Sequence, residues 1–361
     1  MDIISLTKKQ LREALDLNTY WQNKEVVMPK SKARWLLKNE RIEEDDYVAI
    51  IGLENTQIIG YTLIVPDIIQ TKDHKTCKIH WIHIWCVDKN CKDGILGPYI
   101  FNKTIKILNQ QVLLNSYQEN TNKFFDKGPF EIINKRLRYT VFFNLEPDII
   151  ISKFPIFKYV DWLIVLCNKT IVKSVNYLNQ KKLKKITAHL TYEYLNELDE
   201  ETWEFLSKRC QNDFTVKTKS VINWHIDNSQ YTQTPISKKF KFSYYSTGFS
   251  ENIYSYTLKI LEDTALIGFI SYVVNGMEFN LKYFICKDNT YGEKCMAALM
   301  EHFFKSKASY IITDDTKLVQ QIKNQYKPVF TYQIEKKTIA HKNMGLNFED
   351  VLVTDRDGRF H

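Results

Sequence analysis

Five side chains that can bind a metal ion or act as nucleophiles fall within 15 residues of this chain. They lie in or beside the stretch IHWIHIWCVDKNCKDGILGPYIFNKTIKIL, residues 79–108, and are Cys77, His80, His83, Cys86 and Cys91. Two glycines, Gly94 and Gly97, follow them. Three kinds of chemistry compete for this stretch: a metal site, a thiol nucleophile, or a loop whose backbone holds a phosphate.

A zinc site usually has pairs of ligands two to four residues apart on turns. Strand side chains alternate between faces, so Cys77, His83 and Cys91 are predicted to share one face and His80 and Cys86 the other. The pattern therefore favours no metal, and thiols that fill gaps in the core are the alternative. A thiol nucleophile needs a depressed pKa and a partner base. Cys91, just before a predicted helix, is the candidate for it.

A loop whose backbone holds a phosphate would explain more features of this stretch. Gly94 and Gly97 would allow close approach and unusual backbone torsions, and the N-terminus of the following helix favours an anion. Lys89 and Lys92 add positive charge. The spacing fits neither a Walker loop nor a dinucleotide fingerprint.

The elements that must position these residues follow from the local patterns. Residues 1–150 are predicted to form a mixed α/β unit with helices at 5–16 and 29–42, a β-hairpin at 46–69, a strand at 77–88, a helix at about 97–109 and a strand at 111–118. Residues 151–186 are predicted to be a connector. The same order of elements is predicted to recur in residues 187–361, which indicates an internal duplication.

Composition limits the class of protein. The 361 residues are 44% hydrophobic, 14% aromatic and 25% charged, which is typical of a folded chain long enough for two domains. The longest apolar run, VDWLIVLC at 160–167, is too short to span a membrane. Seven cysteines without regular spacing and an N-terminus unlike a signal peptide favour a cytoplasmic protein with reduced thiols.

The net charge of +8 includes local clusters at KKLKK (181–185) and SKKFKF (237–242). These are typical of solvated faces, or of attraction to an anionic ligand such as a nucleotide or coenzyme. Neither cluster is dense enough to make nucleic acid the expected partner.

The order hairpin, long strand, glycine loop, helix and strand, followed by NKFFDKGPF (122–130), resembles the GNAT (GCN5-related) family of acyltransferases. The stretch CKDGIL is similar to the family's pyrophosphate-binding motif, with Gly94 at its first glycine. Leu96 stands at the second glycine, Gly97 comes one residue late, and Cys91 replaces the usual Arg or Gln. Phe125 stands where many members have a tyrosine that protonates the leaving thiolate.

The resemblance implies two tandem GNAT-like domains of α/β class with a mixed (α+β) sheet, the first binding an acyl-CoA such as acetyl-CoA. The residues that it implies for this coenzyme are Cys86, Val87, Lys89, Lys92, Asp93, Gly94, Gly97, Asn122 and Phe125. The second half resembles the family more loosely, through Gly292 before a helix and Tyr326 as a possible acid. VINWHIDNSQYTQTP (221–235) is similar to a segment of bacterial GNAT-like proteins of surface-polysaccharide gene clusters, with His225 where arginine is common.

The expected chemistry is direct attack of an amine on the thioester, which depends mainly on orientation and carbonyl polarisation. His83 is the candidate general base, with Asp88 or Glu119 as alternatives. The acceptor class would be an amino sugar, a nucleotide sugar or an aminoacyl group. A non-catalytic ligand- or partner-binding protein is the first alternative, and a nucleic-acid-associated protein is the second. Residues 351–361 are expected to be a surface terminus or to contact the acceptor.

Overall fold

The computed structural model describes most of the chain and leaves short gaps. The described residues are 2–22, 29–55, 57–72, 75–88, 91, 94–117, 121–147, 151, 155–231, 236–237, 249–250 and 253–360. Of the residues singled out above, Lys89, Lys92, Asp93 and Glu119 lie outside this set. Among the described residues, no helix combines the length and apolar character needed to cross a membrane.

The first unit has the predicted hairpin, long strand and following helix. Its elements are β1 (Asp2–Thr7), α1 (Lys8–Asp16), α2 (Lys30–Leu37), β2 (Tyr47–Glu54), β3 (Gln57–Gln70), β4 (Thr76–Val87), α3 (Leu96–Ile107), β5 (Val112–Leu114), α4 (Asn122–Lys127) and β6 (Phe130–Phe142). The predicted start of the first helix at residue 5 is wrong, because β1 extends to Thr7. Thr7 then caps α1 in a capping box with Gln10.

The second unit repeats this order after a long connecting helix, α6 (Asp161–Ile186). Its elements are β7 (Leu190–Tyr194), α7 (Glu200–Ser207), α8 (Lys219–Ile226), β10 (Ile253–Glu262), β11 (Ala265–Asn275), β12 (Glu278–Cys286), α9 (Gly292–Ser306), β13 (Tyr310–Thr313), α10 (Thr316–Gln325) and β14 (Phe330–His341). A separate strand pair joins β8 (Ile236–Ser237) to β9 (Phe249–Ser250). Both units thus run strand, two helices, three strands, helix, strand, helix, strand, the mixed α/β class expected from the sequence.

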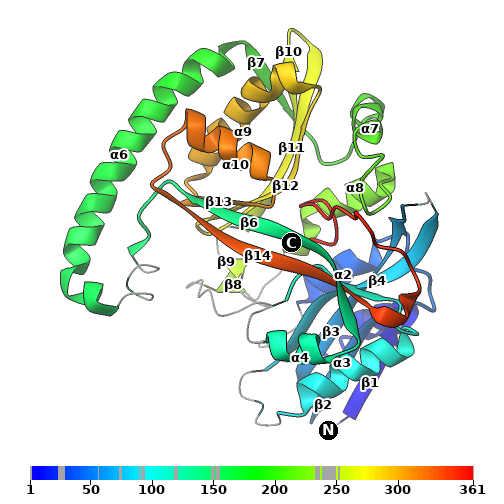
Figure 1. Ribbon diagram of the computed structural model, residues 1–361. Helices are drawn as coiled ribbons and strands as arrows, with labels where there is room; N and C mark the ends of the chain where they lie inside the picture. The colour runs from blue at the N-terminus through cyan, green and yellow to red at the C-terminus, as the bar shows by residue number, and fades with distance from the viewer. Residues whose placement is uncertain are drawn as a thin grey trace.

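One sheet of twelve strands runs through both units in the order β1-β2-β3-β4-β5-β14-β6-β13-β12-β11-β10-β7 (Figure 1). At its centre the last strands of the two units are exchanged. β14, from the second unit, pairs with β5 of the first (Ala340 opposite Leu113), and β6 pairs with β13 of the second (Val141 opposite Ile311). β6 and β14 also pair with each other along their whole length. Each unit therefore needs a strand from the other.

Helices cover both faces of the sheet. In the first unit α1 and α2 pack on one face, through Leu11 and Trp35, and α3 packs on the other through Ile100. In the second unit α9 and α10 cover one face and α7 and α8 the other. Alternation along each strand supplies apolar side chains to both layers.

Candidate functional site

The parallel strands β4 and β5 separate soon after they meet. Only His80 opposite Val112 and Trp81 opposite Leu113 are paired, whereas β4 continues to Val87. The backbone of β4 beyond Trp81 therefore has no strand partner on its β5 side among the described residues. N–H groups on such an edge can bind the polar groups of an extended ligand.

A β-bulge lies within this open part of β4. Ile82 pairs with Ile64 and Ile84 with Leu63, which leaves His83 as the extra residue. The bulge makes one sequence prediction wrong: Cys77 and Cys86 were expected on opposite faces but both pack against the same core cluster, since one inserted residue reverses the alternation. The described residues contain no group of three or more His, Cys, Asp or Glu able to hold a metal ion.

His83 is partly buried, and its ring meets that of Phe360 edge to face, with centroids 5.4 Å apart. Asp88 directly follows the strand, and its backbone N–H donates a 2.7 Å hydrogen bond to the carbonyl oxygen of Ile59. Cys86 and Val87 lie between them on β4, on opposite faces. These four predicted residues therefore lie together along the open edge.

The helix that follows the loop begins at Leu96, with Gly97 in its first turn. The unusual torsions expected of the two glycines are not found, because neither Gly94 nor Gly97 has a positive φ. A Cβ added at Gly94 would meet nothing within 4 Å, so this glycine leaves open space before the helix. Trp85 of β4 donates a 3.0 Å hydrogen bond from its indole N–H to the carbonyl oxygen of Gly97 and so fixes the helix start to the strand.

Phe125 belongs to the core rather than to a surface that a ligand could reach. It is 3% exposed and contacts the rings of Trp85, Phe101 and Phe130. Tyr117 follows β5 by three residues, and its ring packs 4.7 Å from that of Phe125, between centroids. Burial, with a further contribution from Asp126, raises the pKa of Tyr117. Asn122 begins α4, and its side chain lies outside the described part of the structure.

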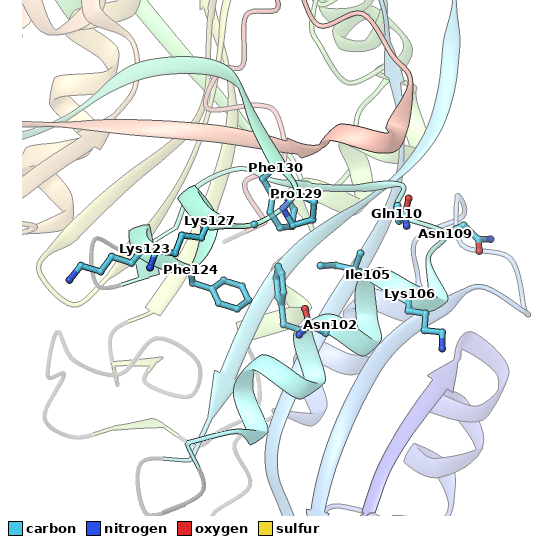
Figure 2. Close-up of a pocket in the computed structure, with 12 residues that line it drawn as sticks. Asn102, Ile105, Lys106, Asn109, Gln110, Lys123, Phe124, Lys127, Pro129 and Phe130 are labelled. Atoms are coloured by element: carbon cyan, nitrogen blue, oxygen red, sulfur yellow. The ribbon is translucent and has the colours of Figure 1, made fainter.

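A cleft of about 680 Å³ lies between α3 and α4 (Figure 2). Phe101, Ile105, Phe124, Pro129 and Phe130 give it an apolar lining, and its polar lining residues are Asn102, Lys106, Asn109, Gln110, Lys123 and Lys127. Three cations and no carboxylate among these residues make the cleft electropositive. Phe101 and Phe124 also contact Trp85, at 4.7 and 5.5 Å between centroids, so the cleft adjoins the open edge of β4.

The second unit has the same strand geometry. β12 and β13 pair from Glu278 to Asn280 only, and a bulge in β12 leaves Lys282 as the extra residue, the counterpart of His83. Lys282 is fully buried and donates a 2.9 Å hydrogen bond to the carbonyl oxygen of His225. Burial, together with the charge of Arg359, lowers the pKa of Lys282 to about 7.

The C-terminal segment 353–360 fills the opening between β12 and β13. Arg359 donates a 3.1 Å hydrogen bond to Asn280 of β12, and Asp355 accepts a 2.6 Å hydrogen bond from Thr313 of β13. The surface terminus considered from the sequence is therefore wrong for this segment, in which Val353, Asp355, Asp357, Arg359 and Phe360 are buried. Among the described residues, this segment occupies the opening of the second unit.

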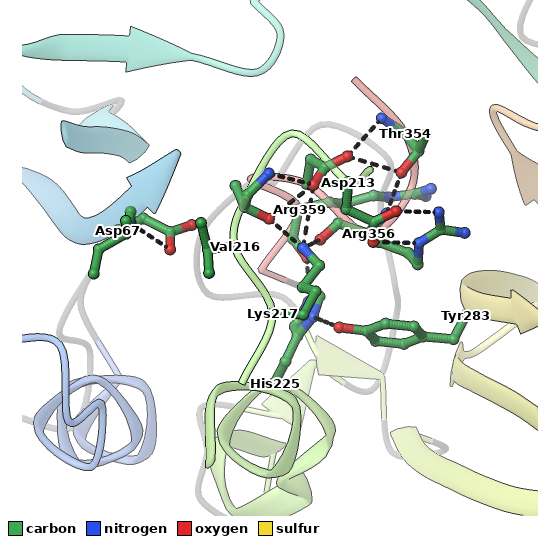
Figure 3. Close-up of polar contacts among 12 residues, drawn as sticks. Asp67, Asp213, Val216, Lys217, His225, Tyr283, Thr354, Arg356 and Arg359 are labelled. Atoms are coloured by element: carbon green, nitrogen blue, oxygen red, sulfur yellow. Dashed lines mark hydrogen bonds and ion pairs between the residues drawn. The ribbon is translucent and has the colours of Figure 1, made fainter. Parts of the chain in front are cut away.

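Hydrogen bonds to the first part of the second unit fix the same segment (Figure 3). The carboxylate of Asp357 accepts hydrogen bonds from the backbone N–H and the hydroxyl of Thr215, at 3.1 and 2.7 Å. It also forms an ion pair with Lys217 at 3.1 Å. Although burial alone would raise it, the pKa of Asp357 is lowered to about 2 by Lys217 and by the N–H of Thr354.

His225 completes the attachment of the segment. Its Nε2–H donates to the carbonyl oxygen of Arg359 at 2.7 Å, which leaves Nδ1 to accept the hydroxyl of Tyr283 at 2.9 Å. Burial and the nearby Lys282 hold the pKa of His225 well below its usual range, so the ring is neutral.

Tyr326 is not brought near the other predicted residues. It ends α10, is 1% exposed and belongs to the core cluster of the second unit. Its hydroxyl has no hydrogen-bond partner among the described residues, and burial raises its pKa.

Several residues of this region had no role in the sequence prediction. They are Trp85, Tyr117 and the three lysines of the cleft. Lys123 and Lys127 share one face of a helix by their i, i+4 spacing, which is a readable signal. The alternating charges of TDRDGR (354–359) are also visible in the sequence, but the local pattern does not indicate that these side chains are buried.

No protein-family model matches this sequence, and a search of curated proteins finds no match. Solved structures of acyltransferases are similar to it over most of its length. A GCN5-related N-acetyltransferase from Anabaena variabilis has a TM-score of 0.46 at 7% identity, covering 94% of this chain and 72% of that chain. A GCN5-related N-acetyltransferase from Kribbella flavida has a TM-score of 0.46 at 10% sequence identity, and the match covers 94% of this chain and 70% of that chain. Saccharomyces cerevisiae N-myristoyltransferase with bound myristoyl-CoA has a TM-score of 0.46 at 12% sequence identity, and the match covers 94% of this chain and 82% of that chain.

Proposed function

We propose that this chain is an acyl-CoA-dependent N-acyltransferase whose coenzyme binds to the first unit. The observation that carries the proposal is the open edge of β4 beyond Trp81, which adjoins an electropositive cleft. Coenzyme A has the matching form: an extended chain with amides at one end and a phosphate-bearing nucleotide at the other. The open edge would bind the extended chain, and Lys106, Lys123 and Lys127 would face the phosphates.

The reaction requires little covalent chemistry from the protein. The amine nitrogen attacks the thioester carbonyl carbon, the carbon–sulfur bond breaks, and the thiolate leaves. Backbone N–H groups of the open edge are suited to stabilise the oxyanion. His83, at the bulge, would take the proton that the attacking amine loses.

Tyr117 is the phenol that we assign to the protonation of the leaving thiolate. Phe125 has no proton to give, and Tyr326 is buried in the other unit. Tyr117 follows β5 closely in the chain, its ring packs on that of Phe125, and its phenol carries a proton that it can give.

The test is calorimetric titration of the full chain with acetyl-CoA, longer acyl-CoAs and desulfo-CoA. We expect binding that is weakened by Lys123→Glu/Lys127→Glu and unchanged by Lys317→Glu/Lys323→Glu, a matched pair of exposed lysines on α10. Gly94→Trp, where the added side chain meets open space in the free protein, should also block binding. No binding of any of these coenzymes at millimolar concentration would refute the proposal.

The burial of Phe125 favours one alternative, a protein that binds a coenzyme without turning it over. Release of free thiol in the presence of amine acceptors distinguishes the two. Amino sugars, nucleotide sugars and aminoacyl compounds form the first panel of acceptors. Coenzyme binding without thiol release across this panel would favour the non-catalytic protein.

A further inference from the structure

Helix α6 carries an apolar surface that the described residues of the protein leave uncovered. In its first two turns and the preceding turn, Tyr159, Trp162 and Leu166 are 86%, 64% and 55% exposed, and Ile156 and Leu163 are exposed as well. The run VDWLIVLC at 160–167 thus lies in solvent rather than in the core. Monomeric proteins rarely expose contiguous apolar surface of this kind without a binding role.

The helix is held by its C-terminal half. Leu183 is buried in the core of the second unit, and Val175 and Ile186 pack against that core. Further towards the N-terminus, the side chain of Asn168 accepts a 2.8 Å hydrogen bond from the backbone N–H of Leu145. Figure 1 shows α6 at the margin of the molecule, with its N-terminal end away from the sheet. The exposed apolar residues therefore lie on a fixed helix and point away from the protein body.

Charge follows the apolar half along the same helix. From Trp162 to Ile186 the sequence has six lysines and no acidic residue. At about 100° per residue, the side chains opposite the buried side fall within an arc of about 80°. Besides Gln180, this outward stripe consists of Trp162, Leu166, Lys169, Lys173, Tyr177 and Lys184. Only one of the six lysines, Lys182, has a hydrogen bond to the protein body among those described, to Gln325 at 3.1 Å.

We propose that α6 binds to the surface of an anionic lipid bilayer. Tryptophan and tyrosine beside aliphatic residues are typical of side chains that enter the interface between headgroups and acyl chains. Lysines on the same stripe match the negative charge of phospholipid headgroups. The helix lies on the bilayer, with Trp162 and Leu166 inserted and Lys169, Lys173 and Lys184 over the headgroups.

A second copy of the chain fits this surface less well. Parallel pairing along the helix would place lysine against lysine, and antiparallel pairing would place the lysines of one copy over the apolar residues of the other. A bilayer offers apolar and anionic surface together. The inference is independent of the proposed acyltransferase activity.

The experiment is co-sedimentation of the full chain with sucrose-loaded vesicles. We expect binding to mixed phosphatidylcholine–phosphatidylserine vesicles at low salt, weaker binding at high salt because headgroup charges are screened, and little binding to phosphatidylcholine alone. Trp162→Ser/Leu166→Ser should abolish binding. Lys169→Gln/Lys173→Gln should reduce the vesicle partition coefficient roughly thirtyfold. Each lysine near an anionic surface raises that coefficient about fivefold, and the two effects multiply.

Matched controls use exposed residues elsewhere. Leu17→Ser/Leu352→Ser removes two exposed leucines, 78% and 68% exposed, and Lys317→Gln/Lys323→Gln removes two exposed lysines. Both should bind as the wild type does. Far-UV circular dichroism checks that all variants fold, and the comparison of vesicle types on the wild-type chain needs no variant.

Four outcomes would overturn the proposal. The first is no binding of the wild type to anionic vesicles at low salt, and the second is equal loss in the control variants. The third is a concentration-dependent dimer that Trp162→Ser/Leu166→Ser dissociates, which would make a second copy the partner. The fourth is binding that needs the lysines but not Trp162 and Leu166, which would indicate a soluble polyanion.

Discussion

Trp35 of α2 and Trp224 of α8 stack with their ring centroids 4.2 Å apart, and each indole N–H donates a 2.9 Å hydrogen bond to the backbone carbonyl oxygen of the other. The two helices belong to different units, and both rings are buried. The pair thus joins the units through one reciprocal contact, in addition to the shared sheet.

The first prediction concerns this pair. Trp35→Phe and Trp224→Phe should each lower the free energy of unfolding by about 2 kcal/mol, because each removes a buried indole hydrogen bond and leaves a smaller ring in a packed site. The double variant should lose less than the sum, by about 1 kcal/mol, since the stacking is lost only once. Urea unfolding monitored by circular dichroism measures all three. Strict additivity would show that the rings act independently, and Trp162→Phe is the exposed control.

Two glycines should respond to alanine with opposite signs. Gly97→Ala should stabilise the protein by about 0.5 kcal/mol, because the residue is helical and the added Cβ makes ordinary contacts at 3.4 Å or more. Gly358→Ala should destabilise it by about 2 kcal/mol or more, because φ is +60° and the Cβ would lie 2.8 Å from the ring of Trp81. Thermal unfolding compares them. Destabilisation at Gly97 would contradict the described helix start.

The stability should depend on pH through Asp357. Its folded pKa of about 2 lies below the ordinary value, so the ionised carboxylate stabilises the fold above the ordinary pKa, and this contribution is lost as the pH falls through about 2. The contribution is about 2 kcal/mol. The stability difference between the wild type and Asp357→Asn should therefore shrink from about pH 5 to about pH 2. A stability difference that stays constant over this pH range would contradict the lowered pKa of Asp357.

The last prediction separates the candidate catalytic residues. If amine acylation is detected, His83→Gln and Tyr117→Phe should each lower kcat by about 100-fold with coenzyme affinity unchanged, as expected for loss of a proton-transfer group. Tyr326→Phe should leave kcat unchanged and raise the stability by about 1 kcal/mol, because it removes a buried hydroxyl that no described residue hydrogen-bonds. Steady-state kinetics with calorimetric binding tests all three. If only Tyr326→Phe lost activity, the general acid would be Tyr326 of the second unit instead of Tyr117.

The local patterns predicted much of the fold. The hairpin, the strand up to Asp88 and the helix after the glycines follow from alternation and end signals, and the repeated element order follows from the same patterns in both halves. The bulge at His83 could not be read, because a bulge depends on pairing with β3 rather than on the sequence of β4 alone. The exchange of β6 and β14 and the burial of 353–360 arise from contacts between distant segments, which local patterns do not encode.

The exchanged strands have a consequence for biosynthesis. While the ribosome is still translating residues 330–341, β5 of the first unit has no neighbour on its outer edge, although every other strand of that unit has already been made. An unpaired strand edge invites pairing with other chains. Nascent chains should therefore be vulnerable to aggregation until β14 emerges, and a fragment that ends after β6 should need a chaperone or the missing strand supplied as a separate peptide.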